Sequence, residues 1–211
     1  MRSQRVLLLS LGLGAMAEFL PPPVRLGFVP TAGTPYDDPS FVREDRERLE
    51  RLGYEVRDVE LSAVTADELR VELGRIDALF VAGGNTFFLM QEIRRGGLGD
   101  VLAQAVRSGL PYIGASAGAV IVGPTIEPVR ALDDEHAAPD LDGWDGLDLV
   151  RFVVLPHFGK EKYLARYEQI ETEFGSDLDL RRLRDDEALL VVGTEEPTLI
   201  SSPLILHDAP A

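Results

Sequence analysis

The pentapeptide Gly114–Gly118, with the sequence Gly-Ala-Ser-Ala-Gly, constrains this chain more than any other segment. It fits the G-x-S-x-G pattern, in which a serine stands on a strained turn between a strand and a helix and exposes its hydroxyl. Residues 111–113 have the apolar character of a short buried strand, and residues 117–122 that of a buried helix start. We therefore expect Ser116 to be a nucleophile. The alternative is a turn whose small residues serve only close packing.

Apolar runs alternate with helical patterns along most of the chain, which favours a parallel sheet covered on both faces. The expected strands are 6–10, 24–29, 54–61, 76–82, 111–113 and 152–155, and the expected helices are 39–52, 65–74, 86–95, 100–107 and 160–174. Short runs at 188–192, 198–201 and 204–207 predict an antiparallel edge. We predict an α/β fold, a three-layer sandwich with a mostly parallel central sheet, in a single domain over residues 1–211.

Charge and composition exclude several classes of partner and site. The net charge of −15 argues against nucleic acid or an anionic membrane as partner, because long-range repulsion opposes both. A chain without cysteine has no disulfide, no thiolate nucleophile and no cysteine-ligated metal, and three histidines disfavour a histidine-rich metal site. We expect no metal and no organic cofactor.

The N-terminal residues allow two interpretations. Two arginines, the apolar run 6–13 and Ala15-Met16-Ala17 imitate a short secretory signal with its cleavage site. A buried first strand that ends in a glycine-containing loop explains the same residues, and we favour it. We therefore expect a cytoplasmic protein.

A serine nucleophile needs a base within hydrogen-bond reach. His157 directly follows the expected strand 152–155, and sites in parallel α/β sheets gather at the carboxyl ends of strands, where Ser116 also falls. We expect His157 to be the base, the alternative being a core histidine bound to backbone. His136 and His207 are expected to be solvated.

An oxyanion hole needs backbone N–H groups that no side chain obstructs. Gly83 and Gly84 end the strand that precedes the elbow strand, and Ala117 follows the serine, so these three residues are candidate donors. Gly83-Gly84-Asn85 is also compatible with a phosphate cradle at a helix start, but neither a Walker lysine nor the G-x-G-x-x-G spacing accompanies it.

Four blocks of sequence together resemble the peptidase E family, the aspartyl dipeptidases among serine peptidases. They are Val-Ala-Gly-Gly-Asn-Thr-Phe at 81–87, Tyr-Ile-Gly-Ala-Ser-Ala-Gly-Ala at 112–119, Gly-Pro-Thr-Ile at 123–126 and Leu-Pro-His-Phe at 155–158. The blocks occur in the family's order and, with the strands between them, cover most of the chain. The resemblance implies a fold similar to class I glutamine amidotransferases, and a homodimer.

The resemblance also implies site residues: Ser116 as nucleophile, His157 as general base, and oxyanion donors from Gly83, Gly84 and Ala117. The family's glutamate lies in a Gly-x-x-Glu turn near the C-terminal strands, and Gly193-Thr-Glu-Glu196 matches it with Glu196 in register. Glu195 is an adjacent rival. An acid after the Pro-Thr-Ile block is a second rival, which here means Asp133 or Asp134. We rank Glu196 first and Asp133 next.

Preference for an N-terminal aspartate requires a cation facing the substrate carboxylate, which a bidentate arginine supplies best. The chain's two lysines, Lys160 and Lys162, both lie within five residues of His157. The expected substrate-binding residues are Asn85, Lys160, Lys162 and Arg166, with Arg130 as a further cation. Since no single arginine matches the family's aspartate-binding position, strict aspartyl preference and a broader aminopeptidase activity both stay open.

The sequence thus predicts a serine peptidase that hydrolyses dipeptides or short peptides at the N-terminal residue. One alternative is an esterase or acyl hydrolase that uses the same serine. Another is a silent amidotransferase-like binding domain. Glutamine hydrolysis itself is disfavoured, because true amidotransferases use cysteine and carry a glutamate two residues beyond the histidine, where this chain has Ser116 and Gly159.

Overall fold

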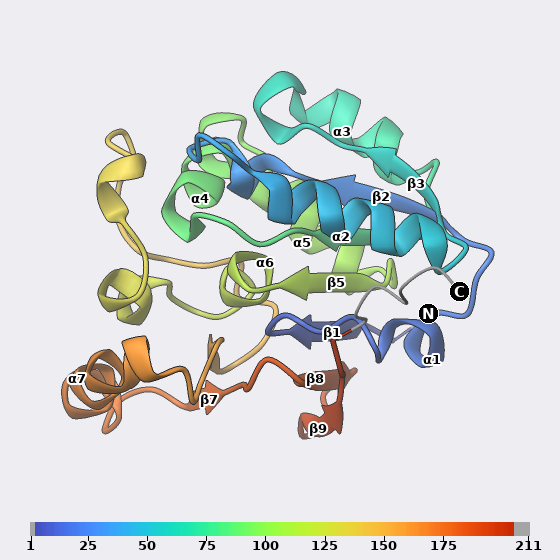
Figure 1. Cartoon of the computed structure of the whole chain (residues 1–211). Helices are drawn as coiled ribbons and strands as arrows, with labels where there is room; N and C mark the ends of the chain where they lie inside the picture. The colour runs from blue at the N-terminus through green and yellow to red at the C-terminus, as the bar shows by residue number, and fades with distance from the viewer. Residues whose placement is uncertain (1–2, 205–211) are drawn as a thin grey trace.

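A seven-stranded sheet forms the centre of the molecule in the computed structural model, which describes residues 3–204 (Figure 1). Its strands lie in the order β3-β2-β4-β5-β1-β8-β9, with the first five parallel and the last two antiparallel to their neighbours. They are β1 (Arg5–Leu9), β2 (Arg25–Val29), β3 (Glu55–Asp58), β4 (Ala78–Val81), β5 (Tyr112–Ala115), β8 (Glu187–Val192) and β9 (Thr198–Ser201). The predicted α/β fold, with its mostly parallel sheet and antiparallel C-terminal strands, is confirmed.

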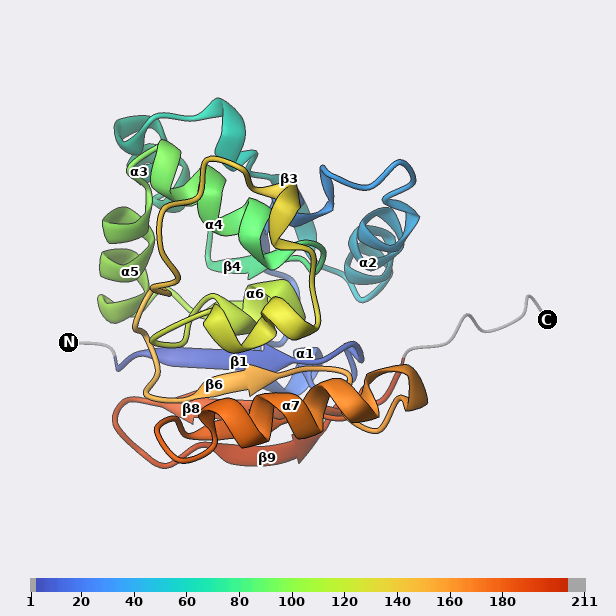
Figure 2. The same cartoon turned by 90° about the vertical axis from the view of Figure 1, so that its left-hand side faces the viewer.

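Helices cover both faces of this sheet, as Figure 2 shows with α2 on one side of β4 and α3 and α5 on the other. They are α1 (Met16–Phe19), α2 (Ser40–Arg51), α3 (Ala66–Leu73), α4 (Thr86–Arg95), α5 (Gly99–Arg107), α6 (Ala117–Val120) and α7 (Leu164–Phe174), with 3₁₀ turns η1 (Thr31–Gly33), η2 (Leu61–Ala63), η3 (Glu127–Ala131), η4 (Glu135–Ala137) and η5 (Glu161–Tyr163). Because strand side chains alternate between faces, Leu7 and Leu9 pack with α1 and α2, whereas Val6 and Leu8 pack into the core that α3 to α7 cover. No helix within residues 3–204 is both long and apolar enough to cross a membrane.

Two helices, α3 and α4, begin at capping residues. Thr65 and Glu68 form the expected capping box of α3, with the Thr65 N–H donating to the Glu68 carboxylate at 2.9 Å. The Asn85 side chain accepts a hydrogen bond from the Phe88 N–H at 2.8 Å and so caps α4. These caps satisfy N–H groups that have no partner inside the helix, which is why both helices begin there.

Several elements differ from expectation. Strand β6 (Val153–Leu155) pairs only with β7 (Leu180–Arg182), an unpredicted strand, in a separate two-stranded sheet. The helix expected over 160–174 begins as the turn η5 and becomes α-helical only from Leu164. The strand expected at 204–207 falls on residues 205–207, outside the described residues, and Leu204 is not in a strand.

The carboxyl ends of β4, β5 and β1 meet at one edge of the sheet. The three strands are adjacent and parallel, so the residues that follow them converge: Gly83 shortly after β4, Ser116 after β5 and Ser10 after β1. The Ser116 N–H donates to the Leu9 carbonyl at 2.9 Å and ties two of these ends together. This edge is where open α/β sheets place their ligand sites.

Candidate active site

Ser116 stands on a strained turn between β5 and α6. Its φ of 48° and ψ of −109° lie in a region that side-chain-bearing residues rarely occupy. The turn is crowded: a Cβ on Gly114 would lie 2.2 Å from the Gly118 carbonyl oxygen, and one on Gly118 would lie 2.2 Å from the Val81 carbonyl oxygen. Glycine at both positions therefore permits the sharp turn that directs the Ser116 hydroxyl away from the sheet.

His157 lies next to this hydroxyl. Its Nε2 is 3.0 Å from the Ser116 Oγ, although 41 residues separate the two in sequence. The histidine follows β6 with a φ of 66°, and its backbone N–H donates to the Ser10 Oγ at 2.7 Å. Its ring stacks on Tyr163 with centroids 6.3 Å apart. Backbone and ring are thus both held, which directs Nε2 at the serine.

Asp185 contacts the imidazole of His157 on the side opposite Ser116. Its Oδ1 lies 2.7 Å from the His157 Nδ1 and also accepts from the Ser10 hydroxyl at 3.0 Å. Its Oδ2 lies 2.7 Å from the Lys160 Nζ. Burial raises the pKa of Asp185, but the hydrogen bonds from His157 and Lys160 outweigh it and hold this pKa well below its usual range. The carboxylate is therefore charged at neutral pH.

Glu196 does not occupy this position, which corrects the first-ranked acid of the sequence analysis. Its side chain is 93% exposed and lies 3.9 Å from an Arg181 nitrogen. The reason is the direction of β8: it is antiparallel to β1, so its end at Val192 pairs with Arg5, at the edge opposite the serine. The residues just before β8 lie at the serine's edge instead. Glu195 follows the same end of β8 as Glu196.

Asp133 lines the cavity beside Ser116 but does not bond to His157. Its carboxylate accepts hydrogen bonds from the Thr86 N–H at 2.6 Å, the Asp134 N–H at 3.0 Å and the Asn85 amide at 3.1 Å. Burial raises the pKa of Asp133, and the hydrogen bonds from Thr86 and Asp134 oppose the rise. The rival acid therefore anchors the start of α4. The Asp134 side chain accepts from the His136 N–H and caps η4.

The glycine turn after β4 packs directly on the serine. A Cβ on Gly83 would lie 3.1 Å from the Ser116 Cβ, and Gly84 has a φ of 141°. Within residues 3–204 the N–H groups of Gly83 and Gly84 have no backbone partner, and both residues line the cavity. Ala117 is the first residue of α6, where the N–H has no partner inside the helix. All three expected oxyanion donors thus lie around the serine.

A cavity of about 680 Å³ opens in front of Ser116 and His157. Lys160 and Lys162 line it as expected, but Asn85 and Arg166 are not among the lining residues. Asn85 is buried and bonds to Asp133 and the Asp134 carbonyl, while Arg166 lies over the Tyr163 ring at 5.6 Å. One wall was not predicted from the sequence. α2 and the loop before it form this wall with Tyr36, Phe41, Glu44, Asp45 and Arg48.

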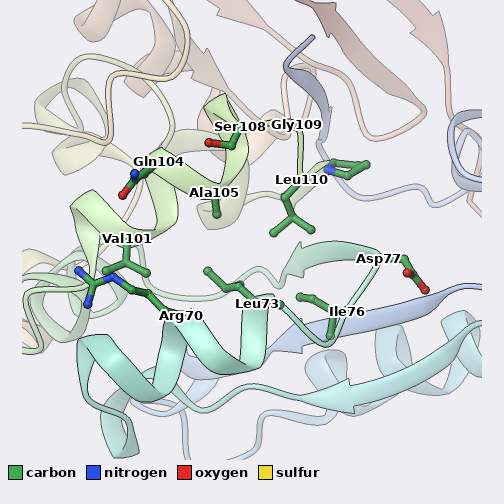
Figure 3. A pocket seen from close by; sticks show the side chains of 12 residues that line it. Arg70, Leu73, Ile76, Asp77, Val101, Gln104, Ala105, Ser108, Gly109 and Leu110 are labelled. Carbon is green, nitrogen blue, oxygen red and sulfur yellow. The ribbon is translucent and has the colours of Figure 1, made fainter. Parts of the chain in front are cut away.

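A second hollow of about 570 Å³ lies at the opposite edge of the sheet (Figure 3). The apolar side chains of Leu73, Ile76, Val101 and Leu110 surround it in the figure, with polar groups at the margin. It contains no histidine, and Asp77 at its margin is bonded to Arg25 at 2.6 Å. The pairing of a serine with an imidazole therefore distinguishes the first cavity. Among residues 3–204 no group of three or more His, Asp or Glu side chains is arranged to hold a metal ion.

Comparison with known proteins identifies a peptidase family. The model of peptidase family S51 matches residues 13–198. The uncharacterized peptidase Lmo0363 of Listeria monocytogenes is 33% identical over 80% of this chain and 82% of its own length. Peptidase E of Streptomyces coelicolor is 37% identical over 69% of this chain and 56% of its own.

A solved structure supports the same family. The crystal structure of a Listeria monocytogenes protein presented as a candidate peptidase E superimposes with a TM-score of 0.87 and 29% identity, over 94% of this chain and 98% of that one. The family match, the relatives and the shared fold agree with one another. The chain therefore belongs to peptidase family S51, the peptidase E family, and is a serine-type peptidase.

Proposed function

We propose that the chain removes the N-terminal residue of dipeptides or short peptides by means of a Ser116-His157-Asp185 triad. The observation that carries this proposal is the continuous line of contacts, 3.0 Å from the Ser116 Oγ to the His157 Nε2 and 2.7 Å from the Nδ1 to Asp185. Such a line lets the imidazole accept the serine proton while the carboxylate stabilises the imidazolium that forms.

The reaction proceeds in two halves. The Ser116 Oγ attacks the carbonyl carbon of the first peptide bond as its proton passes to the His157 Nε2, and the N–H groups of Gly83, Gly84 and Ala117 stabilise the oxyanion. Collapse of this intermediate breaks the C–N bond, and the imidazolium gives its proton to the leaving amine. Water, deprotonated by His157, then hydrolyses the acyl-enzyme and restores the serine.

The size of the cavity supports short substrates. Its volume of about 680 Å³ lies within the range of ~300–1,000 Å³ that is usual for small-molecule sites. The aromatic residues Tyr36 and Phe41 pack edge to face at 5.4 Å and form part of its wall. A dipeptide or tripeptide fits such a volume, whereas a folded protein does not enter it.

The charges around the cavity favour a broad aminopeptidase over a strict aspartyl dipeptidase. Lys160 is bound to Asp185 at 2.7 Å, and Arg48 is bound to both Glu44 and Asp45, at 2.9 and 3.0 Å. Among the described lining residues, only Lys162 is a cation without a carboxylate partner, and it lies over the Tyr163 ring at 4.5 Å. Within residues 3–204, the lining therefore offers no arginine that is free for bidentate binding of an aspartate side chain.

The esterase alternative is weakened by the identity of the acid. In α/β-hydrolases the acid precedes the histidine in the chain, and Asp133 would have fitted that order. Asp185, the carboxylate that contacts the imidazole, follows His157. The chain order serine, histidine, acid therefore differs from the order found in α/β-hydrolases.

One set of assays tests the proposal. The purified protein is treated with a fluorophosphonate and the adduct is mapped by mass spectrometry, beside Ser116→Ala. Leu-Xaa, Asp-Xaa and simple ester substrates are then compared. We expect an adduct on Ser116, hydrolysis of Leu-Xaa at least as fast as that of Asp-Xaa, and no turnover by Ser116→Ala. Ester turnover without peptide turnover would instead identify an acyl hydrolase, and no adduct would leave a binding domain.

We further infer one catalytic domain over residues 1–211 that acts as a homodimer in the cytoplasm. The dimer and the location rest on the family resemblance and on the interpretation of the N-terminal residues as a strand, and β1 (Arg5–Leu9) supports that interpretation. Light scattering coupled to gel filtration tests the dimer, and fractionation of the source cells tests the location.

A further inference from the structure

The ammonium of Lys160 is bound to the acid of the triad. Its Nζ lies 2.7 Å from the Asp185 Oδ2, while the Oδ1 accepts from the His157 Nδ1 at 2.7 Å and from the Ser10 hydroxyl at 3.0 Å. Both carboxylate oxygens are thus engaged, by Ser10 after β1 and by the turn that carries His157 and Lys160. A lysine held in this way is poorly suited to bind a substrate carboxylate, which is the role expected from the sequence.

The backbone between His157 and Lys160 brings the two side chains to the same carboxylate. His157 and Gly159 both have positive φ, 66° and 89°. The Lys160 N–H donates to the His157 carbonyl at 3.4 Å, which closes the turn. A Cβ on Gly159 would meet no atom within 4 Å, so glycine is needed there for its φ and not for space. The turn therefore carries base and cation to opposite oxygens of Asp185.

We propose that Lys160 is a positioning residue, whose ammonium fixes the Asp185 carboxylate against His157 and offsets part of that carboxylate's charge. This inference rests on the proposed peptidase mechanism. A positive charge beside Asp185 opposes the formation of a second positive charge on the imidazole. Removal of the Lys160 ammonium is therefore expected to change the pH dependence of the reaction.

The other groups around the pair do not supply this charge. His157 faces the Ser116 and Ser10 hydroxyls, the Tyr163 ring and Asp185. Asp185 faces His157, Ser10 and Lys160. Burial raises the pKa of Tyr167, and the charge of Asp185 adds to this rise. A tyrosine side chain is never cationic, so neither Tyr163 nor Tyr167 supplies a positive charge. Lys160 is therefore the cation in contact with the pair among the described residues.

The test compares Lys160→Met, Lys160→Arg and the matched control Lys162→Met, which removes the same charge from the same cavity wall. Two quantities are measured: the pH dependence of kcat/KM on Leu-Xaa, and the midpoint of the His157 ring titration by NMR, assigned with His157→Asn. For Lys160→Met we expect the acidic midpoint of the kcat/KM profile and the NMR midpoint to rise by roughly 0.5–1 pH unit. We also expect a lower kcat and little change in KM. Lys160→Arg restores the wild-type profile, and Lys162→Met leaves the midpoint unchanged.

The two proposals fail in different ways. Absence of peptide turnover by the wild-type protein would remove the proposed function, but the NMR titration would still report on Lys160. A midpoint that is the same in Lys160→Met and wild type would overturn the positioning role, as would an equal shift in Lys162→Met. A rise in KM alone would restore the substrate-binding role. Thermal melting shows that each variant is folded, and Lys160→Gln replaces Lys160→Met if the latter is not.

Discussion

The carboxylate of Asp185 lies 2.7 Å from the His157 Nδ1, across a separation of 28 residues. The replacement Asp185→Asn keeps the size of the side chain but removes its charge, so the imidazolium loses its stabilising partner. We expect kcat to fall by about 10²–10⁴-fold, measured by single-turnover hydrolysis of Leu-Xaa. Glu196→Gln is the control, because that side chain is 93% exposed and remote from the imidazole. Loss of activity in the control with retention in Asp185→Asn would reverse the assignment.

Ser10 is buried and connects His157 to Asp185. Its hydroxyl accepts from the backbone N–H of His157 and donates to the Asp185 carboxylate. We expect Ser10→Ala to lower kcat by roughly tenfold and to reduce the free energy of unfolding by about 1–3 kcal/mol. Ser202→Ala is a matched control: it removes another buried hydroxyl that accepts from a backbone N–H, that of Ala15, and donates to Gly12. The control loses similar stability, as followed by urea unfolding, with no change in kcat.

Gly84 tests the geometry of the oxyanion turn. Its φ is 141°, and an added Cβ would lie 2.2 Å from the Ala32 carbonyl oxygen. Gly97 also has a positive φ, of 61°, but a Cβ there would meet nothing within 4 Å. We expect Gly84→Ala to lose at least ~2 kcal/mol more unfolding free energy than Gly97→Ala, and to lose activity as well. Equal unfolding free energies of the two variants in chemical denaturation would contradict the close contact between Gly84 and the Ala32 carbonyl.

Asp45 gives the cavity wall a pH-dependent stability. Burial raises the pKa of this carboxyl to about 6, although Arg48 at 3.0 Å lowers it. A pKa raised in the folded state means that the folded protein binds more protons than the unfolded chain between about pH 4 and 6. Stability from this group is therefore present below the unfolded pKa and is lost as pH rises through 6.

The corresponding measurement compares wild type with Asp45→Asn at pH 4 and pH 7. We expect the variant to gain roughly 2–3 kcal/mol of unfolding free energy relative to wild type between the two pH values, because it has no carboxyl to ionise. The trend with pH is diagnostic, because an asparagine side chain has no proton to lose between pH 4 and pH 7. A difference that stays constant across the range would show that Asp45 is ionised without penalty.

The sequence predicted those parts of the site that depend on short stretches of chain. Ser116 is surrounded by the small residues that its turn needs, and His157 directly follows an apolar strand. The start of α3 is likewise set by Thr65 and Glu68, three residues apart. In each case the interacting residues are neighbours in sequence, so their spacing carries the information.

Asp185 could not be predicted in this way, because its position depends on the antiparallel pairing of β8 with β1. That pairing puts Ala188 beside Leu9 and Val192 beside Arg5, so the start of β8, rather than its end, lies near the serine. The signal that was available is the acidic pair Asp185-Asp186 just before the strand. Lys160 was noticed as a rare lysine near the histidine, but its carboxylate partner lies 25 residues further on, in a segment the sequence analysis left unassigned.

The place of β1 in the sheet delays completion of the site during synthesis. β1 lies between β5 and β8, so one of its edges stays unpaired until residues 187–192 have left the ribosome. Asp185 emerges only just before them. A nascent chain that already carries Ser116 and His157 therefore still lacks the carboxylate that contacts the imidazole.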